Sequence, residues 1–425
     1  EMASNPAAML RIDPKRVQRV TLANLPTEVH TERIPLSYQQ EAAHIHRQSS
    51  SPAGLHDWAP LFKSLVESTG APRKGPARVQ QVDDAELNRL RVPKELVPSL
   101  GHLADVVGVS PAQLMRWTQS ASIQLSRRSL RSADGPALAF LLKSSPRLEI
   151  LGLANNPGLT ADGMKPIAEA ITYCPALVAL DVSRTGLLTR TVGPGDGHAN
   201  SFEARHEKLD PRAAIALAQS LRSRFVKELA VEGLGFRAHS LHLLHRAWST
   251  AGDGKDVMSL LRLRIGDNRL GDEGARELVN SLRRVGTLTE VDVSANGIGD
   301  AGAGALRDLL EWSGNLQVLT AAHNRLGPGG LHKIAHALHL ATKLVALDLS
   351  GNCLVVGGNR GVRALCESLG SAAAPRLREL NLAQAGLTPH HTKMLAHSAM
   401  LRVEVGLVEL EVGTATARGL PPPGR

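Results

Sequence analysis

A leucine-rich motif recurs along this chain at a fixed spacing, and no other feature restricts its fold as strongly. The pattern L-x-x-L-x-L-x-x-N-x-L begins at Leu260, Leu288, Leu316 and Leu344, so four consecutive copies lie 28 residues apart. Less regular copies begin at Ser120, Leu148, Leu177, Val226 and Leu377, and a last strand-like segment begins at Val405. This period predicts a stack of similar units, each of which buries its apolar edge against the next.

Each unit combines a short strand with a helix. The alternating leucines of the motif have the spacing of a strand, and the segment that follows is amphipathic. In residues 271–285, for example, Ala275, Leu278 and Leu282 fall on one helical face. Because only 3% of the residues are aromatic while 43% are hydrophobic, small regular layers of Leu, Val and Ala must fill the core.

The period and the motif resemble the ribonuclease-inhibitor-like class of leucine-rich repeats over residues 120–412. The resemblance implies an α/β solenoid with a curved parallel β-sheet on the concave side and helices on the convex side. It also implies a ladder of buried asparagines that satisfy backbone groups at the turns, formed by Asn156, Asn268, Asn296, Asn324 and Asn352. Arg128, Thr185, Leu234 and Ala385 occupy the same slot in the weaker units and cannot serve in the same way.

Outside the repeats, we expect three further regions. Residues 1–119 should form an N-terminal region of short helices and linkers, whose last part caps the first repeat as an open solenoid requires. Leu177 and Val226 are 49 residues apart, which indicates a loop insertion near residues 188–207. Residues 413–425 should form a flexible Pro-rich tail.

Composition excludes several classes of protein. Three cysteines, Cys174, Cys353 and Cys366, without CxxC spacing indicate neither a disulfide framework nor a zinc site. No window approaches 18 apolar residues, and the first residues lack the apolar core of a secretion signal, so we expect an intracellular protein of the cytoplasm or cytoskeleton. The net charge of +9 permits an anionic partner without selecting one.

The segment GIGDAGAG, residues 297–304, could be mistaken for a phosphate-binding loop. It lacks the Lys and hydroxyl of a P-loop, and related glycine turns occur once per repeat. We therefore interpret its glycines as turn residues and expect Asp272 or Asp300 to cap a helix. The histidines of residues 332–339 should face solvent on a helix, and no metal ligand set, cofactor motif or catalytic motif is visible. The sequence predicts a non-enzymatic protein without a cofactor.

The concave face offers the most specific functional signal. The third, fifth and seventh positions of each motif should face the open side, because the leucines between them point inward. The candidate partner-binding residues at these positions are Glu228, Glu232, Arg262, Arg264, Glu290, Asp292, Asp348, Glu379, Glu409 and Glu411, with Glu409 at the fifth and Glu411 at the seventh position. This mostly acidic surface favours a basic peptide or helix and disfavours nucleic acid. Solvated carboxylates partly paired with the two arginines remain an equally good interpretation.

Because the concave face is mostly acidic, the residues that give the chain its net positive charge should lie on the convex side and in the N-terminal region, in the segments PKRVQR, RKGPAR and RSRFVK. An anionic partner, such as a tubulin-like surface, would fit there. We expect no membrane partner. The leading hypothesis is a protein–protein interaction scaffold within a larger assembly. The order of the units and the segment LANLPTEV resemble the leucine-rich repeat subunits of the ciliary nexin-dynein regulatory complex, which implies a structural role in the axoneme.

Two alternatives from other functional classes stay open. Bacterial effectors of the GALA type, which act as ubiquitin-ligase substrate adaptors, carry repeats with helices like GPALAFLL, although only LPTEV hints at their F-box. The Ran-type GTPase-activating proteins share the repeat class, but their acidic tail is missing here.

Overall fold

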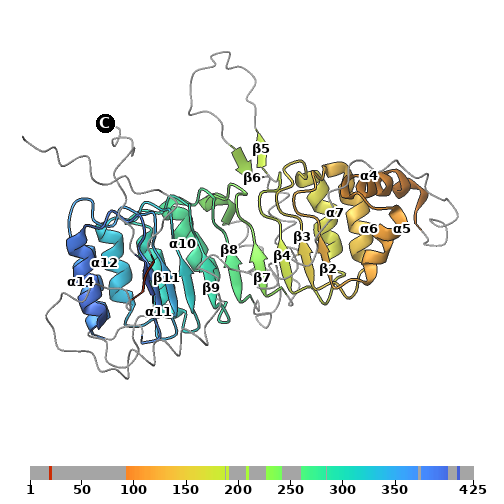
Figure 1. Cartoon of the computed structure of the whole chain (residues 1–425). Helices are drawn as coiled ribbons and strands as arrows, with labels where there is room; N and C mark the ends of the chain where they lie inside the picture. The colour runs from red at the N-terminus through yellow and green to blue at the C-terminus, as the bar shows by residue number, and fades with distance from the viewer. Residues whose placement is uncertain are drawn as a thin grey trace, which may run out of the picture.

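The computed structural model describes residues 19–21, 92–186, 188–190, 207–209, 226–241, 260–283, 285–371, 375–400 and 409–411. Its main element is a curved sheet of 11 strands in the order β1-β13-β12-β11-β10-β9-β8-β7-β4-β3-β2 (Figure 1). The strands are β1 Arg19–Thr21, β2 Ser122–Gln124, β3 Ile150–Gly152, β4 Ala179–Asp181, β7 Glu228–Ala230, β8 Arg262–Arg264, β9 Glu290–Asp292, β10 Val318–Thr320, β11 Ala346–Asp348, β12 Glu379–Asn381 and β13 Glu409–Glu411. From β2 to β13, all neighbouring pairs are parallel.

The helices of the repeats cover one face of this sheet. They are α6 Gly135–Lys143, α7 Ala161–Ile171, α10 Gly271–Leu282, α11 Ala303–Trp312, α12 Pro328–Ala337, α13 Arg360–Gly370 and α14 Pro389–Met400. Consecutive helices pack side by side, as α10 does with α11 and α12 with α13. This arrangement confirms the expected α/β solenoid, in which the sheet lines one side and the helices the other (Figure 1).

The core lies between the sheet and the helices. Along the main sheet from β2 to β12, the central residue of each strand is buried in it, and Leu263, Val291 and Leu319 are at most 1% exposed. From the helical side, Leu278, Leu306 and Ile334 are also at most 1% exposed. One row of leucines from the strands therefore packs against one row from the helices, as the repeat period predicted.

The asparagine ladder is present in the described repeats. The Asn324 side chain accepts hydrogen bonds from the backbone N–H groups of Asn296 (3.0 Å) and Ile298 (3.1 Å). Its Nδ2 donates to the carbonyls of Val293 and Ala321, both at 3.0 Å. Each asparagine thus joins its own turn to the turn of the preceding repeat, which satisfies buried backbone groups where the strand ends.

A second set of contacts links the repeats at the starts of their helices. The Asp272 carboxylate accepts hydrogen bonds from the N–H groups of Gly299 (2.6 Å) and Gly302 (2.9 Å), which belong to the next repeat. Asp300 does the same for Gly327 (2.6 Å) and Gly330 (2.8 Å). A Cβ atom at Gly302 would lie 2.5 Å from the Asp272 carboxylate, so glycine permits the close approach. The two aspartates cap the following helix rather than their own.

Replacing Asp300 by Ala should destabilise the junction between α11 and α12. The substitution leaves two backbone N–H groups at the start of α12 without their acceptor, and loss of a helix cap costs about 1–2 kcal/mol. Urea denaturation followed by circular dichroism measures the change. Asp308→Ala is the matched control, because the Asp308 carboxylate pairs with its exposed neighbour Arg307 and should change stability little. Equal stability of the two variants would contradict a capping role for Asp300.

The two ends of the solenoid are closed differently. Next to the first repeat, α4 Val97–Val107 packs against α6, and α5 Pro111–Arg116 follows it. The 3-10 turns η3 Lys94–Leu96, η4 Trp117–Gln119 and η5 Ser132–Asp134 complete this end. At the far end, β1 pairs antiparallel with β13. The short helices expected within the N-terminal region, at residues 37–48 and 58–68, and the tail 413–425 lie outside the described residues.

Two expectations about the strands need correction. The insertion between β4 and β7 is more than a loop, because β5 Leu188–Arg190 and β6 Glu207–Leu209 form an antiparallel hairpin that stands away from the main sheet (Figure 1). The register of the last strand is also shifted. Glu409 pairs with Glu379 and Glu411 with Asn381, so they take the third and fifth positions instead of the fifth and seventh. The irregular spacing before β13 misled the sequence alignment.

Candidate protein-binding face

Four adjacent strands of the sheet carry a concentration of charge on the concave face. The parallel register places Glu228 of β7, Arg262 of β8 and Glu290 of β9 in one row across the sheet. A second row, two residues further along each strand, contains Asp181 of β4, Ala230 of β7, Arg264 of β8 and Asp292 of β9. We refer to Asp181, Glu228, Glu232, Arg262, Arg264, Glu290 and Asp292 as the charged cluster.

In the first row, one arginine bridges two glutamates. Arg262 pairs through Nη1 with Glu228 Oε1 and through Nε with Glu290 Oε1, the latter at 2.9 Å. The side chain of Glu228 is 7% exposed and that of Arg262 is 27% exposed, so the row is largely withdrawn from water. The second carboxylate oxygen of Glu228 has no hydrogen-bond partner.

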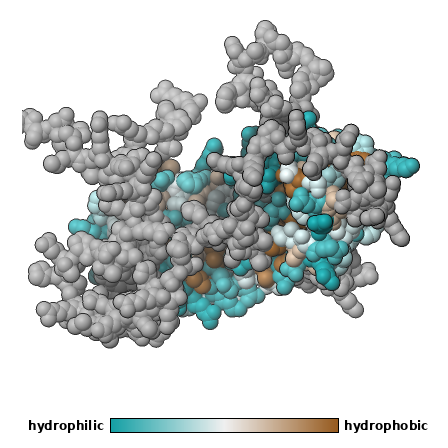
Figure 2. All heavy atoms as spheres, turned by 45° about the vertical axis from the view of Figure 1, so that its right-hand side comes forward, coloured by the Kyte–Doolittle hydropathy of each residue, from teal (hydrophilic) through white to brown (hydrophobic). Residues whose placement is uncertain are grey.

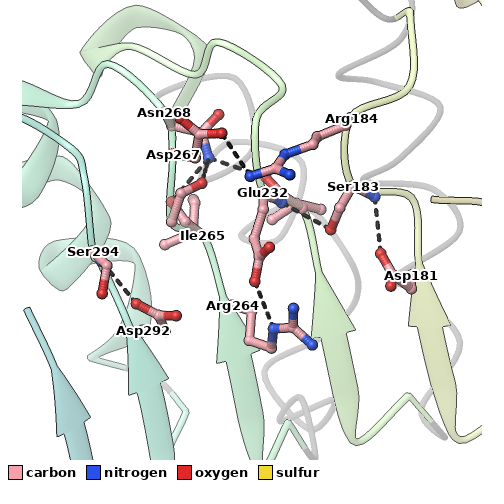
Figure 3. A network of polar contacts seen from close by, with 12 residues as sticks. Asp181, Ser183, Arg184, Glu232, Arg264, Ile265, Asp267, Asn268, Asp292 and Ser294 are labelled. Carbon is pink, nitrogen blue, oxygen red and sulfur yellow. Dashed lines mark hydrogen bonds and ion pairs between the residues drawn. The ribbon is translucent and has the colours of Figure 1, made fainter. Parts of the chain in front are cut away.

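In the second row, Arg264 is the central cation. Its Nε lies 2.6 Å from Glu232 Oε1, and the side chain leans from β8 toward β7 (Figure 3). The outer carboxylates accept backbone hydrogen bonds, Asp181 from Ser183 N–H (3.0 Å) and Asp292 from Ser294 N–H (2.8 Å). These turns are local to each strand and fix the carboxylates at the same height on either side of Arg264.

Burial sets the electrostatics of the charged cluster. Loss of solvent raises the pKa of Asp181, Asp292 and Glu290, although hydrogen bonds and the nearby arginines act in the opposite direction. Burial lowers the pKa of Arg264, but Glu232, Asp181 and Asp292 outweigh it and leave that pKa raised. Five carboxylates against two arginines give the cluster a formal charge of −3 when all are ionised. Both arginines are paired with glutamates of the cluster, and the cluster keeps a net negative charge.

The remaining predicted residues lie differently. Asp348 is 0% exposed, and its carboxylate accepts hydrogen bonds from Ser350 N–H (2.9 Å) and Asn381 Nδ2 (3.2 Å). It offers no oxygen to a partner in this structure, so we leave it out of the candidate site. Glu379 is half-buried on β12, and Glu409 and Glu411 are placed here only by the register of β13.

An ion pair beside the cluster was missed by the sequence analysis. Arg184 Nη2 lies 2.9 Å from Asp267 Oδ2, across the intervening turn of Gly233 (Figure 3). A side chain at Gly233 would collide with Arg184, since a Cβ there would lie 2.7 Å from its Cγ. Both charged residues have positive φ angles, 54° and 53°, at the same turn position of their repeats. That shared turn position, followed across the units, was the signal that could have paired them.

The described residues give no support for a metal or nucleotide site. Nowhere in the described ranges do three His, Cys, Asp or Glu side chains gather as metal ligands would. The N–H groups of Gly299 and Gly302 in GIGDAGAG are already bonded to Asp272, so they are not free for a phosphate. His332 is half-buried on α12 beside Arg360, with its ring 4.5 Å from His336, rather than fully solvated.

The described surface is mainly hydrophilic where Figure 2 shows it. Among the described residues, the exposed large hydrophobic side chains are Tyr173, Leu340 and Val356, and they lie on separate units. None of the helices within the described ranges has the length and apolar character that a membrane span requires. Polar and charged contacts therefore dominate what the described part of the chain offers to a partner.

The strand register, the asparagine ladder and the charged concave face together define a leucine-rich repeat solenoid. Comparison with known families agrees, because residues 258–279 and 287–306 match the family described as "Leucine Rich repeat". The solved tropomodulin C-terminal domain of Caenorhabditis elegans is 17% identical, with 39% of this chain and 92% of that chain covered and a TM-score of 0.30.

A second solved structure, the internalin InlF of Listeria monocytogenes, is 14% identical, with 65% of this chain and 64% of that chain covered and a TM-score of 0.35. This chain thus spans less than two thirds of the internalin's length. No curated protein sequence matches the chain.

Proposed function

We propose that this protein is a non-enzymatic interaction scaffold whose charged cluster binds a basic segment of a partner protein. The observation that carries the proposal is the excess of buried negative charge over β4, β7, β8 and β9, where both arginines are already paired. A rigid strand framework holds these carboxylates in fixed rows, which suits recognition of a protein segment by charge and shape.

The raised pKa of Asp181, Asp292 and Glu290 supports a cationic partner. Burial disfavours the charged form of each carboxylate, and a nearby Lys or Arg would offset that cost. The same charge repels the phosphates of a nucleic acid, which disfavours that class of partner on this face. Hydrogen-bonded turns at Ser183 and Ser294 hold the outer carboxylates in place before a partner arrives.

A peptide-binding experiment tests the proposal on the full chain. A short fluorescein-labelled peptide of alternating Gly and Lys should bind by fluorescence anisotropy, and its acidic counterpart of Gly and Glu should not. The double variant Glu290→Gln, Asp292→Asn should weaken binding of the lysine peptide by about tenfold, since each lost charge pair contributes about 1 kcal/mol or less.

The matched control is Glu169→Gln, Glu273→Gln, which removes the same charge from exposed positions on α7 and α10. It should leave peptide binding nearly unchanged. Equal weakening by both double variants would mean that net charge alone attracts the peptide, and the proposed site would then be wrong. Circular dichroism checks that both variants retain the fold.

Within this class, the finer hypothesis is a structural subunit of the axonemal nexin-dynein regulatory complex. It is supported by the resemblance in the order of the repeats, including the insertion before β7. Cosedimentation of the purified chain with axonemes tests it, and crosslinking mass spectrometry on the native assembly would name the neighbours. Capture of a ubiquitin-ligase adaptor would instead favour the GALA-type alternative, and stimulated GTP hydrolysis by Ran would favour the GTPase-activating one.

A further inference from the structure

At the C-terminal end of the solenoid, the last repeat strand pairs with a strand from the N-terminal part of the chain. Strand β13 belongs to the last repeat, and its outer neighbour is β1, from the opposite end of the chain. The pair is antiparallel, whereas the other neighbouring pairs of this sheet are parallel. Strand β1 therefore does not continue the repeat, and it covers backbone groups of β13 that an edge strand would leave open.

Charge accompanies this pairing. The register sets Arg19 opposite Glu411 and Thr21 opposite Glu409, with Val20 opposite Leu410 between them. Opposite charges in facing positions of two antiparallel strands favour their pairing. In the sequence, Lys15 and Arg16 precede β1, so the chain just before and within β1 is basic, whereas β13 carries two glutamates.

The contact is also short. Three residues of β1 pair with three of β13, and a two-stranded contact of this length is marginal on its own. Seventy residues of sequence, 22–91, separate β1 from the cap at the other end of the sheet. A short strand joined through a long connection is held by effective concentration more than by its own contacts, and a competing strand can replace it.

From this placement, we infer that the outer edge of β13 is a strand-addition site for a basic, antiparallel segment of a partner protein, and that β1 occupies this site in the free chain. Main-chain hydrogen bonds would supply the affinity of such an added strand, and Glu409 and Glu411 would select basic side chains. This site is at the end of the sheet and separate from the charged cluster of β4, β7, β8 and β9. It does not depend on the function proposed for that cluster.

The test disrupts β1 in the chain and supplies the same sequence as a separate peptide. A labelled peptide of residues 13–24, DPKRVQRVTLAN, is the probe, and the receptor is the full chain with Arg19→Pro and Val20→Pro. Two consecutive prolines remove N–H donors from both edges of β1, so the pairing is lost whichever edge faces β13. The peptide should bind this variant about tenfold more tightly than the unaltered chain, because the site is no longer occupied in cis.

Matched controls separate the outcomes. The same two prolines at Ser50 and Ser51 should leave peptide affinity at the level of the unaltered chain, and a peptide with Glu in place of Lys15, Arg16 and Arg19 should not bind. In the double-proline variant, hydrogen exchange at residues 409–411 should accelerate and should slow again when the peptide is added.

Absence of peptide binding to the double-proline variant, or equal affinity for it and the unaltered chain, would overturn the inference. The Glu290→Gln, Asp292→Asn variant should bind the peptide of residues 13–24 as the unaltered chain does. The lysine peptide therefore tests the charged cluster, and the peptide of residues 13–24 tests β13, so either proposal can be contradicted without the other.

Discussion

The Asn324→Ala variant is expected to lose about 3–4 kcal/mol of unfolding free energy, a large share of the stability of a typical domain. Asn324 is 7% exposed, and its amide serves two backbone N–H groups and at least two carbonyls of adjoining turns. Alanine leaves these groups buried without partners, and each costs about 1–3 kcal/mol. Guanidinium denaturation followed by circular dichroism measures the loss.

Asn315→Ala is the matched control for this prediction. The Asn315 side chain also accepts and donates hydrogen bonds between repeats, with Lys343 Nζ (2.6 Å) and the Gly286 carbonyl (2.7 Å), but these contacts are exposed. Water can replace them, so the control should lose about 1 kcal/mol or less. A comparable loss in both variants would show that burial of the ladder position is not what makes Asn324 important.

Arg264→Met should destabilise the protein by about 3 kcal/mol at neutral pH. The arginine is 25% exposed and interacts electrostatically with Glu232, Asp181 and Asp292, so its removal leaves buried carboxylates uncompensated. Methionine keeps much of the apolar stem, which limits the loss of packing. Arg307→Met is the control, because Arg307 is 43% exposed and its pairs with Asp308 and Glu311 are at the surface.

The effect of Arg264→Met should depend on pH. Burial already raises the pKa of Asp181 and Asp292 above the unfolded value, and removal of the nearby cation raises both further. A carboxylate with a raised pKa favours folding below the unfolded pKa and loses that contribution as pH rises through the folded pKa. The deficit relative to the unaltered chain should therefore narrow as the pH is lowered from 7 toward about 4, near the pKa of an unfolded Asp. A deficit that stays constant with pH would indicate lost packing instead.

Much of the fold could be predicted because the sequence motif of each unit identifies the core and turn residues of that unit. The motif positions of Leu263 and Asn268, for example, identify a core residue and a ladder residue without reference to any distant segment. The last strand shows where this logic fails. No asparagine follows Glu409 in the sequence to mark the ladder position, and the predicted register was two positions too far along.

The candidate site was predicted as a list of positions but not as a set of contacts. The residues of β7, β8 and β9 were identified because their motif positions face the open side. The sequence did not decide whether their charges bind a basic partner or are merely solvated and partly paired with the two arginines. The structure shows that Arg262 and Arg264 are paired and that the carboxylates remain in excess. Asp348 faces the same side and is buried, which position within the motif could not reveal.

By itself, the sequence determined the repeat unit, its period, its core and its ladder, because these depend on interactions within one unit and with the unit beside it. Only the tertiary structure decided which charges meet across strands, which helix each aspartate caps and where the N-terminal strand lies. The partners in these contacts come from different units, or from opposite ends of the chain as in β1 and β13. The strand register brings the partners from different units together, and the outer edge of the assembled sheet is where β1 pairs with β13. Neither the register nor the edge can be read from the residues of one unit.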